Sequence, residues 1–315
     1  MDQLQCMEVF VQVADTGNFS QVARDRGLSN SVVSKYVATL EEDLGVRLLN
    51  RTTRSLSLTE IGEDYRSRCR QILDHVENAR QSVTSLHIEP RGLLRINAPM
   101  SFGIMHLGGV ISRFTEAYPD VEIDLELNDR FIDVVGEGFD IALRIGSLEA
   151  STLIARKLAP IQRVCCGAPS YLKSKGSPVH PRNLVDHNGL YYGHRGWTEY
   201  WHLNGPDGRH DVDGRVTLKS NNGDVLKAAA VSGAGLVVMP TFIMWEEVKA
   251  DRLIHVLPDY RSQELGLYAL YPPTRNLSAK VRLFIDHLVD AFGPEPYWDE
   301  PFSFDNSEAA AASQV

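Results

Sequence analysis

The side chains with the clearest chemical capacity in this 315-residue sequence lie between residues 29 and 54. One group consists of hydroxyl, amide and ammonium side chains, which can hydrogen-bond base edges in a DNA major groove: Ser29, Asn30, Ser31, Ser34, Lys35 and Thr39. A second group combines arginines with short hydroxyls, which suits contacts with phosphate oxygens: Arg51, Thr52, Thr53 and Arg54. No acidic residue occurs from Leu44 to Thr59. DNA contact is therefore the first hypothesis for this stretch.

Two short amphipathic helices joined by a tight turn must position the first group. Apolar residues recur at gaps of three and four, which places them on one face of each helix: Val22, Ala23, Val33, Val37 and Leu40. Ser20 is placed to cap the first helix, Ser29 or Asn30 to cap the second, and Gly27 to turn the chain between them. This pattern predicts a helix-turn-helix, followed by a two-stranded wing. The alternative is a three-helix bundle that binds no DNA, and the acid-free arginine wing argues against it.

A long amphipathic helix follows the wing. From Glu60 to about His87 apolar residues recur at threes and fours, and neither Pro nor Gly interrupts the run after Gly62. A long helix with one apolar seam usually meets a partner helix, so residues 60–88 are predicted to form a linker and dimerisation helix. Packing on the chain's own domain is the alternative. The helix predicted over residues 2–15 is assigned to the core behind the helix-turn-helix.

A family pattern is visible at these residues. The matching positions are Ala23, Leu28-Ser29, Ser34, Leu40-Glu41, Leu44-Gly45, Leu48, Arg51, Arg54, Leu58-Thr59 and Gly62. Together they resemble the N-terminal winged helix-turn-helix of LysR-type transcriptional regulators. The chain departs from the family's frequent Gln, Ala and Phe at Asn30, Val32 and Leu49, and none of these changes removes a charge or donor needed for docking.

The resemblance implies a bacterial, ligand-responsive transcription regulator that binds DNA sequence-specifically. Such a protein reads an inverted repeat in double-stranded DNA as a homodimer or homotetramer, and RNA polymerase is a further expected partner. A small-molecule effector is expected to control DNA occupancy or geometry by changing the population of two assembly states.

Strands and helices alternate from Leu93 to about Gly293, which predicts a doubly wound α/β arrangement. Residues 93–99, 121–128 and 140–146 are predicted strands, residues 101–119 a helix, and residues 131–138 a short helix. This part resembles the effector-binding domain of the same family, which is similar in shape to periplasmic binding proteins.

The predicted domain organisation follows from these segments. It comprises a winged helix-turn-helix DNA-binding domain over residues 1–59, a linker helix over 60–88, an effector-binding domain over 89–293, and a loose acidic tail over 294–315. The effector-binding domain is expected to have two lobes, with lobe 1 over residues 92–161 and 268–293 and lobe 2 over residues 162–267.

In two-lobed α/β folds a ligand binds beyond the carboxyl ends of the strands. This rule selects the following effector-binding candidates: Met100, Ser101, Phe102, Asn128, Arg144, Gly146, Asn221, Asn222, Pro240 and Phe242. Ser101 could cap a helix whose free N–H groups face a carboxylate, with the ligand's apolar body against one of the phenylalanines. A plain helix cap is the alternative for Ser101, and an ion pair with Asp140 or Glu137 is the alternative for Arg144. We expect a small organic effector that carries a carboxylate.

Composition restricts the class of protein without supporting DNA binding. The net charge is −9, and residues 1–90 contain 10 Lys and Arg against 13 Asp and Glu. The DNA hypothesis therefore depends on local placement, because physiological salt screens exposed charges beyond about 8 Å. The sequence has no run of 18 uncharged apolar residues and no signal peptide, so a cytoplasmic protein without a membrane partner is expected.

The sequence offers little for catalysis. Four cysteines, Cys6, Cys69, Cys165 and Cys166, lack metal-site spacing and are interpreted as buried thiols, with a redox-sensing cysteine as the alternative. The motifs GxSxG, GxxxxGK[ST], HExxH and GxGxxG do not occur, so no catalytic residue, metal site or cofactor is predicted. A non-enzymatic LysR-type regulator is therefore favoured. The alternative is a small-molecule-binding protein or enzyme of the α/β class with an incidental N-terminal helical bundle.

Overall fold

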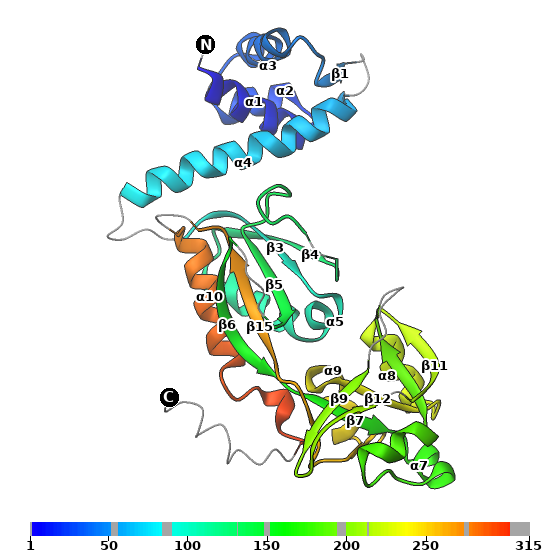
Figure 1. Ribbon diagram of the computed structural model, residues 1–315. Helices are drawn as coiled ribbons and strands as arrows, with labels where there is room; N and C mark the ends of the chain where they lie inside the picture. Colours follow the sequence, from blue (N-terminus) through cyan, green and yellow to red (C-terminus); the bar gives the residue numbers. More distant parts are fainter. Residues whose placement is uncertain are drawn as a thin grey trace. The chain divides into compact units, whose positions relative to one another are not determined.

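The computed structural model describes residues 2–51, 56–83, 90–130, 132–147, 152–193, 200–212, 214–273 and 277–302. The chain divides near Leu94 into an N-terminal and a C-terminal unit, and each is described by itself (Figure 1). Within the described ranges, no helix combines the length and the apolar composition that a membrane crossing requires.

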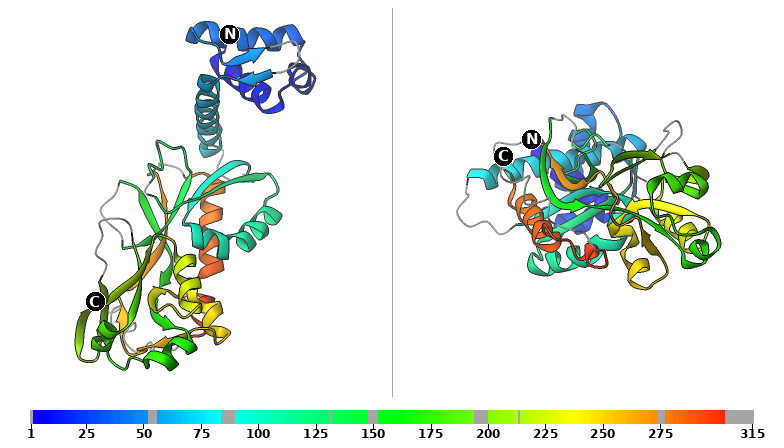
Figure 2. Two further views of the ribbon diagram at one scale, coloured as in Figure 1. Left: turned by 90° about the vertical axis from the view of Figure 1, so that its right-hand side faces the viewer. Right: turned by 60° about the horizontal axis from the view of Figure 1, so that its bottom comes forward.

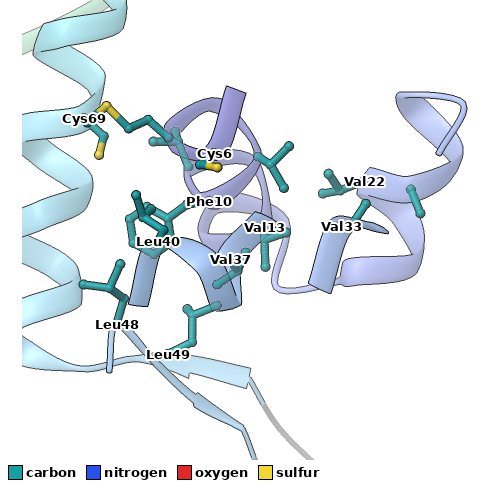
Figure 3. Packing of buried hydrophobic residues seen from close by; sticks show 14 residues of the cluster. Cys6, Phe10, Val13, Val22, Val33, Val37, Leu40, Leu48, Leu49 and Cys69 are labelled. Carbon is teal, nitrogen blue, oxygen red and sulfur yellow. The ribbon is translucent and has the colours of Figure 1, made fainter. Parts of the chain in front are cut away.

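The N-terminal unit is a winged helix-turn-helix followed by a long helix. Its elements are α1 (Gln3–Thr16), α2 (Phe19–Asp25), α3 (Asn30–Leu44), antiparallel strands β1 (Leu49–Arg51) and β2 (Leu56–Leu58), and α4 (Glu60–Val83). Figure 3 shows Phe10, Val37 and Leu40 converging in one core. Leu48 of the wing and Cys69 of α4 are buried in the same core, so the wing and the start of α4 are fixed to the three helices.

The caps of the two central helices differ in one place from expectation. Asn18, and not Ser20, caps α2, because its side-chain oxygen accepts from the backbone N–H groups of both Ser20 and Gln21. Ser29 caps α3 as predicted. Gly27 has a φ of 65°, a left-handed conformation that a glycine adopts without strain, and it lets the chain turn between the helices.

The C-terminal unit contains two five-stranded mixed sheets, one in each lobe. The lobe 1 sheet has the order β4-β3-β5-β15-β6, built from β3 (Gly92–Ala98), β4 (Val121–Leu127), β5 (Ile141–Gly146), β6 (Ile154–Ile161) and β15 (Leu265–Tyr271). Its helices are α5 (Met100–Phe102), the π-helical η1 (Gly103–Leu107), α6 (Gly108–Ala117) and α10 (Ala279–Phe292). In Figures 1 and 2, α10 appears in orange beside this sheet.

The lobe 2 sheet has the order β11-β8-β12-β7-β13, built from β7 (Arg163–Gly167), β8 (Asn188–Tyr192), β11 (Arg215–Ser220), β12 (Leu236–Pro240) and β13 (Ile254–Val256). Its helices are α7 (Pro169–Lys175), η2 (Pro181–Asp186), α8 (Gly223–Val231) and α9 (Thr241–Lys249). A smaller sheet joins β9 (Trp201–Gly205), β10 (Gly208–Val212) and β14 (Arg261–Ser262).

Two strand crossovers connect the lobes. The first runs from β6 to β7 through Gln162, and the second runs from β14 to β15. The return crossing comes about three residues earlier than the predicted boundary at residue 268, because Leu265 already pairs with Ile161 and Gly266 with Gly146 in the lobe 1 sheet.

The short helix predicted over residues 131–138 is wrong for the part that is described: residues 132 and 133 have no regular structure, and residues 134–138 form turns. The Asp133 carboxylate accepts from the backbone N–H of Gly136, and Gly138 has a φ of 74°. This side-chain hydrogen bond and the left-handed glycine stop the chain after a single turn.

The predicted loose tail is also wrong for its first part. Residues Tyr297–Asp299 form the 3-10 helix η3, and Trp298 is 0% exposed. Burial of a complete tryptophan gives this segment a packed position despite its acidic composition. The remainder of the predicted tail, residues 303–315, lies outside the described residues.

Candidate DNA interface and effector site

The exposed face of α3 and its edges carry four of the ten predicted DNA contacts. Ser31, Lys35 and Ala38 follow one another at spacings of four and three and are all exposed, so they share one face of the helix. Ser34 and Thr39 flank this face and are half-buried. The opposite face holds Val33, Val37 and Leu40 in the core. The structure therefore brings the side chains of Ser31, Ser34, Lys35 and Thr39 together on one side of a helix that would fit a major groove.

Two of the predicted contacts also have structural roles. The Ser29 hydroxyl lies 2.8 Å from the Ser31 hydroxyl, and it also accepts from the backbone N–H of Val32 as the α3 cap. The Asn30 side-chain amide donates to the Ser20 hydroxyl at 2.9 Å. Asn30 therefore links the start of α3 to α2, which reduces its freedom to contact a base.

Sequence reasoning overlooked two apolar residues on α3. Val32 is 37% exposed and Ala38 is exposed, although both are apolar. Apolar side chains of this size contact the thymine methyl group in the major groove. The helical spacing from Ser31 and Lys35 indicates Ala38, but its apolar side chain carries no hydrogen-bonding group that would mark it as a candidate.

The wing is fixed to α3 and α4 by polar contacts. The Glu41 carboxylate accepts from the backbone N–H groups of Leu48 and Leu49, at 2.8 and 3.1 Å. The Thr59 hydroxyl donates to the Arg47 carbonyl and accepts from the backbone N–H of Gly62. These bonds set where β1 and β2 leave the core. Arg51 is in β1, whereas Thr52, Thr53 and Arg54 lie outside the described residues, as does the side chain of Arg51.

In the C-terminal unit, Ser101 joins the two lobes. Its hydroxyl donates to the Asp224 carboxylate of α8 at 2.7 Å, and Ser101 is buried. Asp224 also pairs with Lys227 at 3.2 Å. The interpretation of Ser101 as a helix cap is wrong, because Pro99 stands at the N-cap position of α5 with no side-chain hydrogen bond. The effector contact of Ser101 stays a prediction, and in this structure its hydroxyl donates to a carboxylate of the chain itself.

Phe102 and Phe242 also meet across the lobes. Their ring centroids are 5.4 Å apart, and both side chains are almost fully buried. Trp298 packs against Phe102 with a centroid distance of 5.8 Å. The apolar surface predicted for the ligand is therefore covered by the chain's own aromatic side chains.

Buried His106 adds a polar contact between the lobes. Its Nε2 lies 3.0 Å from the Phe242 carbonyl, and its Nδ1 lies 2.6 Å from the Tyr297 hydroxyl. A carbonyl can only accept, so Nε2 carries the proton and Nδ1 accepts from the tyrosine. Burial lowers the pKa of His106 to about 4, which keeps the ring neutral at neutral pH and preserves this arrangement.

Arg144 has the clearest capacity for an anion among the predicted effector contacts. Its guanidinium donates to the carbonyls of Leu143 and Arg130, at 2.7 and 3.3 Å. The two acids considered as its partners are engaged elsewhere: Asp140 pairs with Lys280 and Glu137 with Arg130. Burial is the main cause that lowers the pKa of Arg144. The charge of nearby Asp129 opposes this effect of burial. A partly desolvated guanidinium whose hydrogen bonds go to neutral carbonyls still favours a negatively charged ligand.

The remaining candidates lie at the strand and helix ends that the rule selected. Met100 donates its backbone N–H to Asp129, and Asn128 donates its side-chain amide to Glu126. Asn222 caps α8 by accepting from two backbone N–H groups, and Asn221 before it is exposed. Gly146 ends β5, and Pro240 ends β12 and precedes α9. Of the whole predicted set, Ser101, Phe102 and Phe242 lie in the interlobe contacts described above.

One group among the described residues has metal-ligand spacing, namely His180, Asp207 and His210. The Nε2 atoms of the histidines lie 2.8 and 3.0 Å from the Asp207 carboxylate. Nδ1 of His180 accepts from two N–H groups of Arg182, so the ring proton is on Nε2, where a metal would need a lone pair. The hydrogen bonds from His180 and His210 lower the pKa of Asp207. The group is therefore a hydrogen-bonded tie between the β9–β10 hairpin and η2.

The four cysteines are buried and unbridged. Burial raises the pKa of Cys69 to about 11 and that of Cys165 to about 12, and it raises the pKa of Cys166 well above its usual value. Little thiolate is present at neutral pH in such surroundings, so the chemistry argues against a redox-sensing cysteine.

Comparison with known proteins places both units in one family. Residues 4–63 match the family model described as bacterial regulatory helix-turn-helix protein, lysR family, and residues 87–293 match the LysR substrate binding domain. An HTH-type transcriptional regulator of Haemophilus influenzae is 36% identical over 89% of this chain and 98% of its own length. The regulator PtxR of Pseudomonas aeruginosa is 35% identical over 93% of this chain and 94% of its own length.

A solved structure agrees with this assignment. The structure of CrgA, a LysR-type transcriptional regulator from Neisseria meningitidis, covers 92% of this chain and 98% of its own with 31% identity and a TM-score of 0.60. The relatives above are named as transcriptional regulators and not as enzymes. The chain belongs to the LysR family of DNA-binding transcriptional regulators, with an N-terminal helix-turn-helix and a C-terminal effector-binding domain.

Proposed function

We propose that this regulator binds an inverted-repeat promoter site through α3 and the wing of two paired heads. The observation that carries the proposal is the exposed face of α3, where Ser31, Lys35 and Ala38 are aligned beside a wing held by Glu41 and Thr59. The proposed base contacts are Ser29, Ser31, Ser34, Lys35 and Thr39, with Asn30 in a positioning role, and the proposed phosphate contacts are Arg51, Thr52, Thr53 and Arg54.

Assembly follows from the domain organisation that we infer. Residues 1–59 form the reading head, and the linker helix from residue 60 onward pairs with a second copy. Pairing sets the distance between two heads, which an inverted repeat must match. A homodimer is the smallest assembly that meets this requirement, and a homotetramer is the proposed working form. The protein acts in the cytoplasm, where promoter DNA and RNA polymerase are found.

The effector in this proposal is a small organic carboxylate bound between the lobes of the domain over residues 89–293. Arg144 supplies the positive charge, because its guanidinium is bonded to two carbonyls and not to Asp140 or Glu137. Ser101 can take part only after Asp224 has left its hydroxyl. Effector binding then favours one of two lobe arrangements and changes how the assembly occupies DNA.

DNA binding is tested by gel shift with DNA from upstream of the protein's own reading frame, at several salt concentrations. We expect sequence-selective binding that weakens as salt rises, and Arg51→Ala should weaken binding to all sequences and reduce the salt slope by about one. Absence of selective binding with and without the carboxylates tested below would contradict the proposal.

Effector binding is tested by a thermal-shift screen of small carboxylates on the full chain, because a ligand raises apparent stability. A carboxylate that raises the unfolding temperature of the parent protein should lose most of this effect with Arg144→Gln. Lys157→Gln is the matched control, because Lys157 is an exposed cation of the same sheet that pairs with Glu264. An equal rise in unfolding temperature in the parent protein and both variants would show that Arg144 does not bind the carboxylate.

A further inference from the structure

The segment that follows α10 contacts both lobes through its side chains, in addition to the two strand crossovers that connect them. Helix α10 belongs to lobe 1, where Phe284 contacts Phe114 with a ring-centroid distance of 4.9 Å. Gly293 turns the chain with a φ of 58°. Residues 296–302, here named the C-terminal strap, then pack against α9 of lobe 2. The strap is the red segment at the end of α10 in Figure 1.

The strap contacts lobe 1 through its first two aromatic residues. The Tyr297 hydroxyl donates to Nδ1 of His106. The Trp298 ring lies 4.8 Å from the His106 ring and 5.8 Å from the Phe102 ring. Trp298 is fully buried, so undocking the strap would expose a large apolar surface.

The same residues also contact lobe 2. Trp298 lies 6.3 Å from Phe242, and Tyr297 lies 5.5 Å from Trp245. Burial raises the pKa of Asp299, and the side chain of Thr241, the first residue of α9, opposes that rise.

The end of the strap continues along lobe 2. Glu300 pairs with Lys249 at 3.6 Å, and Phe302 stacks edge-on against His255 at 5.7 Å. Contacts with both lobes therefore come from a run of only a few residues.

The strap is held to lobe 2 by side-chain packing and polar contacts, whereas each strand crossover connects the lobes through the continuous backbone. A pair of strand crossovers between two lobes can act as a hinge for rocking. A third, non-covalent connection opposes rocking while it is docked and allows it when it is released. Its Tyr297 hydrogen bond ends on the same His106 ring that bonds the Phe242 carbonyl of lobe 2. Docking of the strap is therefore linked to the direct interlobe contact.

We propose that the C-terminal strap is a releasable third connection that holds the two lobes in the arrangement seen here and regulates their rocking. In the docked state Trp298 covers Phe102 and Phe242, so the strap and the apolar part of an effector compete for one surface. The consequence for DNA rests on the function proposed above, in which lobe arrangement controls DNA occupancy.

The test compares hydrogen exchange in three forms of the protein: the parent chain, a form ending at Glu295, and a control form ending at Phe302 that keeps the strap. Without the strap, exchange should rise by roughly tenfold or more in residues 100–107 and 241–249, because their interlobe contacts open more often. Protection in the central strands β5 and β12 should stay within about twofold. The control form should behave as the parent chain does.

A point variant keeps the test decisive if the shorter form does not fold. Tyr297→Phe retains the ring, which is 44% exposed, and removes only the hydroxyl that serves His106. It should raise exchange in the same two segments by roughly fivefold to tenfold, the effect of one lost hydrogen bond to a buried acceptor. Unchanged exchange in residues 100–107 and 241–249 of a folded shorter form would overturn the proposal. If the shorter form does not fold, unchanged exchange of these residues in Tyr297→Phe would overturn it.

DNA bending by the same proteins separates the strap from the function on which its consequence rests. If exchange rises and bending of the promoter fragment changes, both are supported. A second outcome is that hydrogen exchange in residues 100–107 and 241–249 rises while DNA bending and DNA affinity stay unchanged. This outcome would support the proposal for the strap and refute the control of DNA by lobe arrangement.

Discussion

Gly62 provides a direct test of how the reading head is held to its linker helix. A Cβ atom at this position would lie 2.0 Å from the carbonyl oxygen and 2.9 Å from the carbonyl carbon of Leu48. Both are backbone atoms at the start of the wing, and the oxygen also accepts from the backbone N–H of Thr59. Carbon–oxygen contacts lie at about 3.3–3.6 Å, so Gly62→Ala would have to move α4 and the wing apart by roughly 1 Å or more.

The expected loss of stability can be isolated with a second helical glycine. Alanine usually stabilises a helix by about 0.5–1 kcal/mol relative to glycine. A Cβ atom on Gly108 in α6 would have no neighbouring atom within 4 Å, so Gly108→Ala should show this gain alone. Gly62→Ala should combine the same gain with an overpacking cost of about 1–3 kcal/mol. The clash is therefore the difference between the net change that Gly62→Ala causes in the N-terminal unit and the gain that Gly108→Ala causes in the C-terminal unit.

Native-state hydrogen exchange is the suitable assay. All four tryptophans lie beyond residue 190, so tryptophan fluorescence does not report on the head. Relative to the parent protein, amides of α3 in Gly62→Ala should lose the overpacking cost of about 1–3 kcal/mol less the alanine gain of about 0.5–1 kcal/mol, whereas in Gly108→Ala they should keep the parent's protection. DNA affinity should fall by roughly tenfold or more, because a displaced wing no longer aligns with α3. Equal protection of α3 and equal DNA affinity in the two variants would refute the packing argument.

Three further outcomes follow from the described contacts. Replacing thymine by uracil in the half-site should weaken binding at the positions read by Val32, and Val32→Ala should reduce that difference; an unchanged difference would exclude Val32 as a methyl contact. Ser101→Ala and Asp224→Ala should show a coupling of about 1 kcal/mol in a double-mutant cycle of urea unfolding, since the bond is charge-assisted but partly hydrated; a coupling near zero would contradict an interlobe bond. Burial raises the pKa of Asp299 to about 6, so the contribution of this carboxyl group to stability is lost as pH rises from about 4 to 6. Burial lowers the pKa of His106 to about 4, so the contribution of this imidazole to stability is lost as pH falls from about 6.5 to 4. These opposite trends should largely cancel in the parent protein, and Asp299→Asn should therefore become less stable as pH falls from 7 to 5; stability of this variant that is constant or rises over that range would refute the assignment.

The elements of the head were predictable because one periodic pattern specifies each of them. The apolar spacing of Val33, Val37 and Leu40 indicates which side of α3 is buried, and the structure confirms that side. The cap of α2 was misplaced because Asn18 and Ser20 are both good capping residues and only the backbone geometry distinguishes them. The exposure of Val32 on α3 could not be predicted, because an exposed valine has the same sequence signal as a core valine.

The interlobe contacts were less accessible to sequence reasoning. The strand-end rule indicated Ser101 and Phe242, but it carries no information on what the opposite lobe presents to them. Asp224 is 123 residues from Ser101 in the chain, and no local period relates the two. The tail prediction used acidity and ignored the spacing of Tyr297, Trp298 and Phe302, which are the residues that give the segment its packed position.

Occupation of the predicted site by the chain itself changes how effector binding should be understood. The Ser101 hydroxyl already serves the Asp224 carboxylate, and the Phe102 surface is already covered by Trp298. An effector that uses these groups must exchange with them, so its measured affinity is the difference between its own contacts and those it displaces. Only this difference can shift the lobes, because a ligand moves an equilibrium by no more than its differential affinity for the two states. Both displaced contacts are interlobe contacts, since Asp224 lies on α8 of lobe 2 and Trp298 also packs on Phe242. Binding and release of the lobes would therefore be a single event, which is the coupling that an effector-controlled regulator requires.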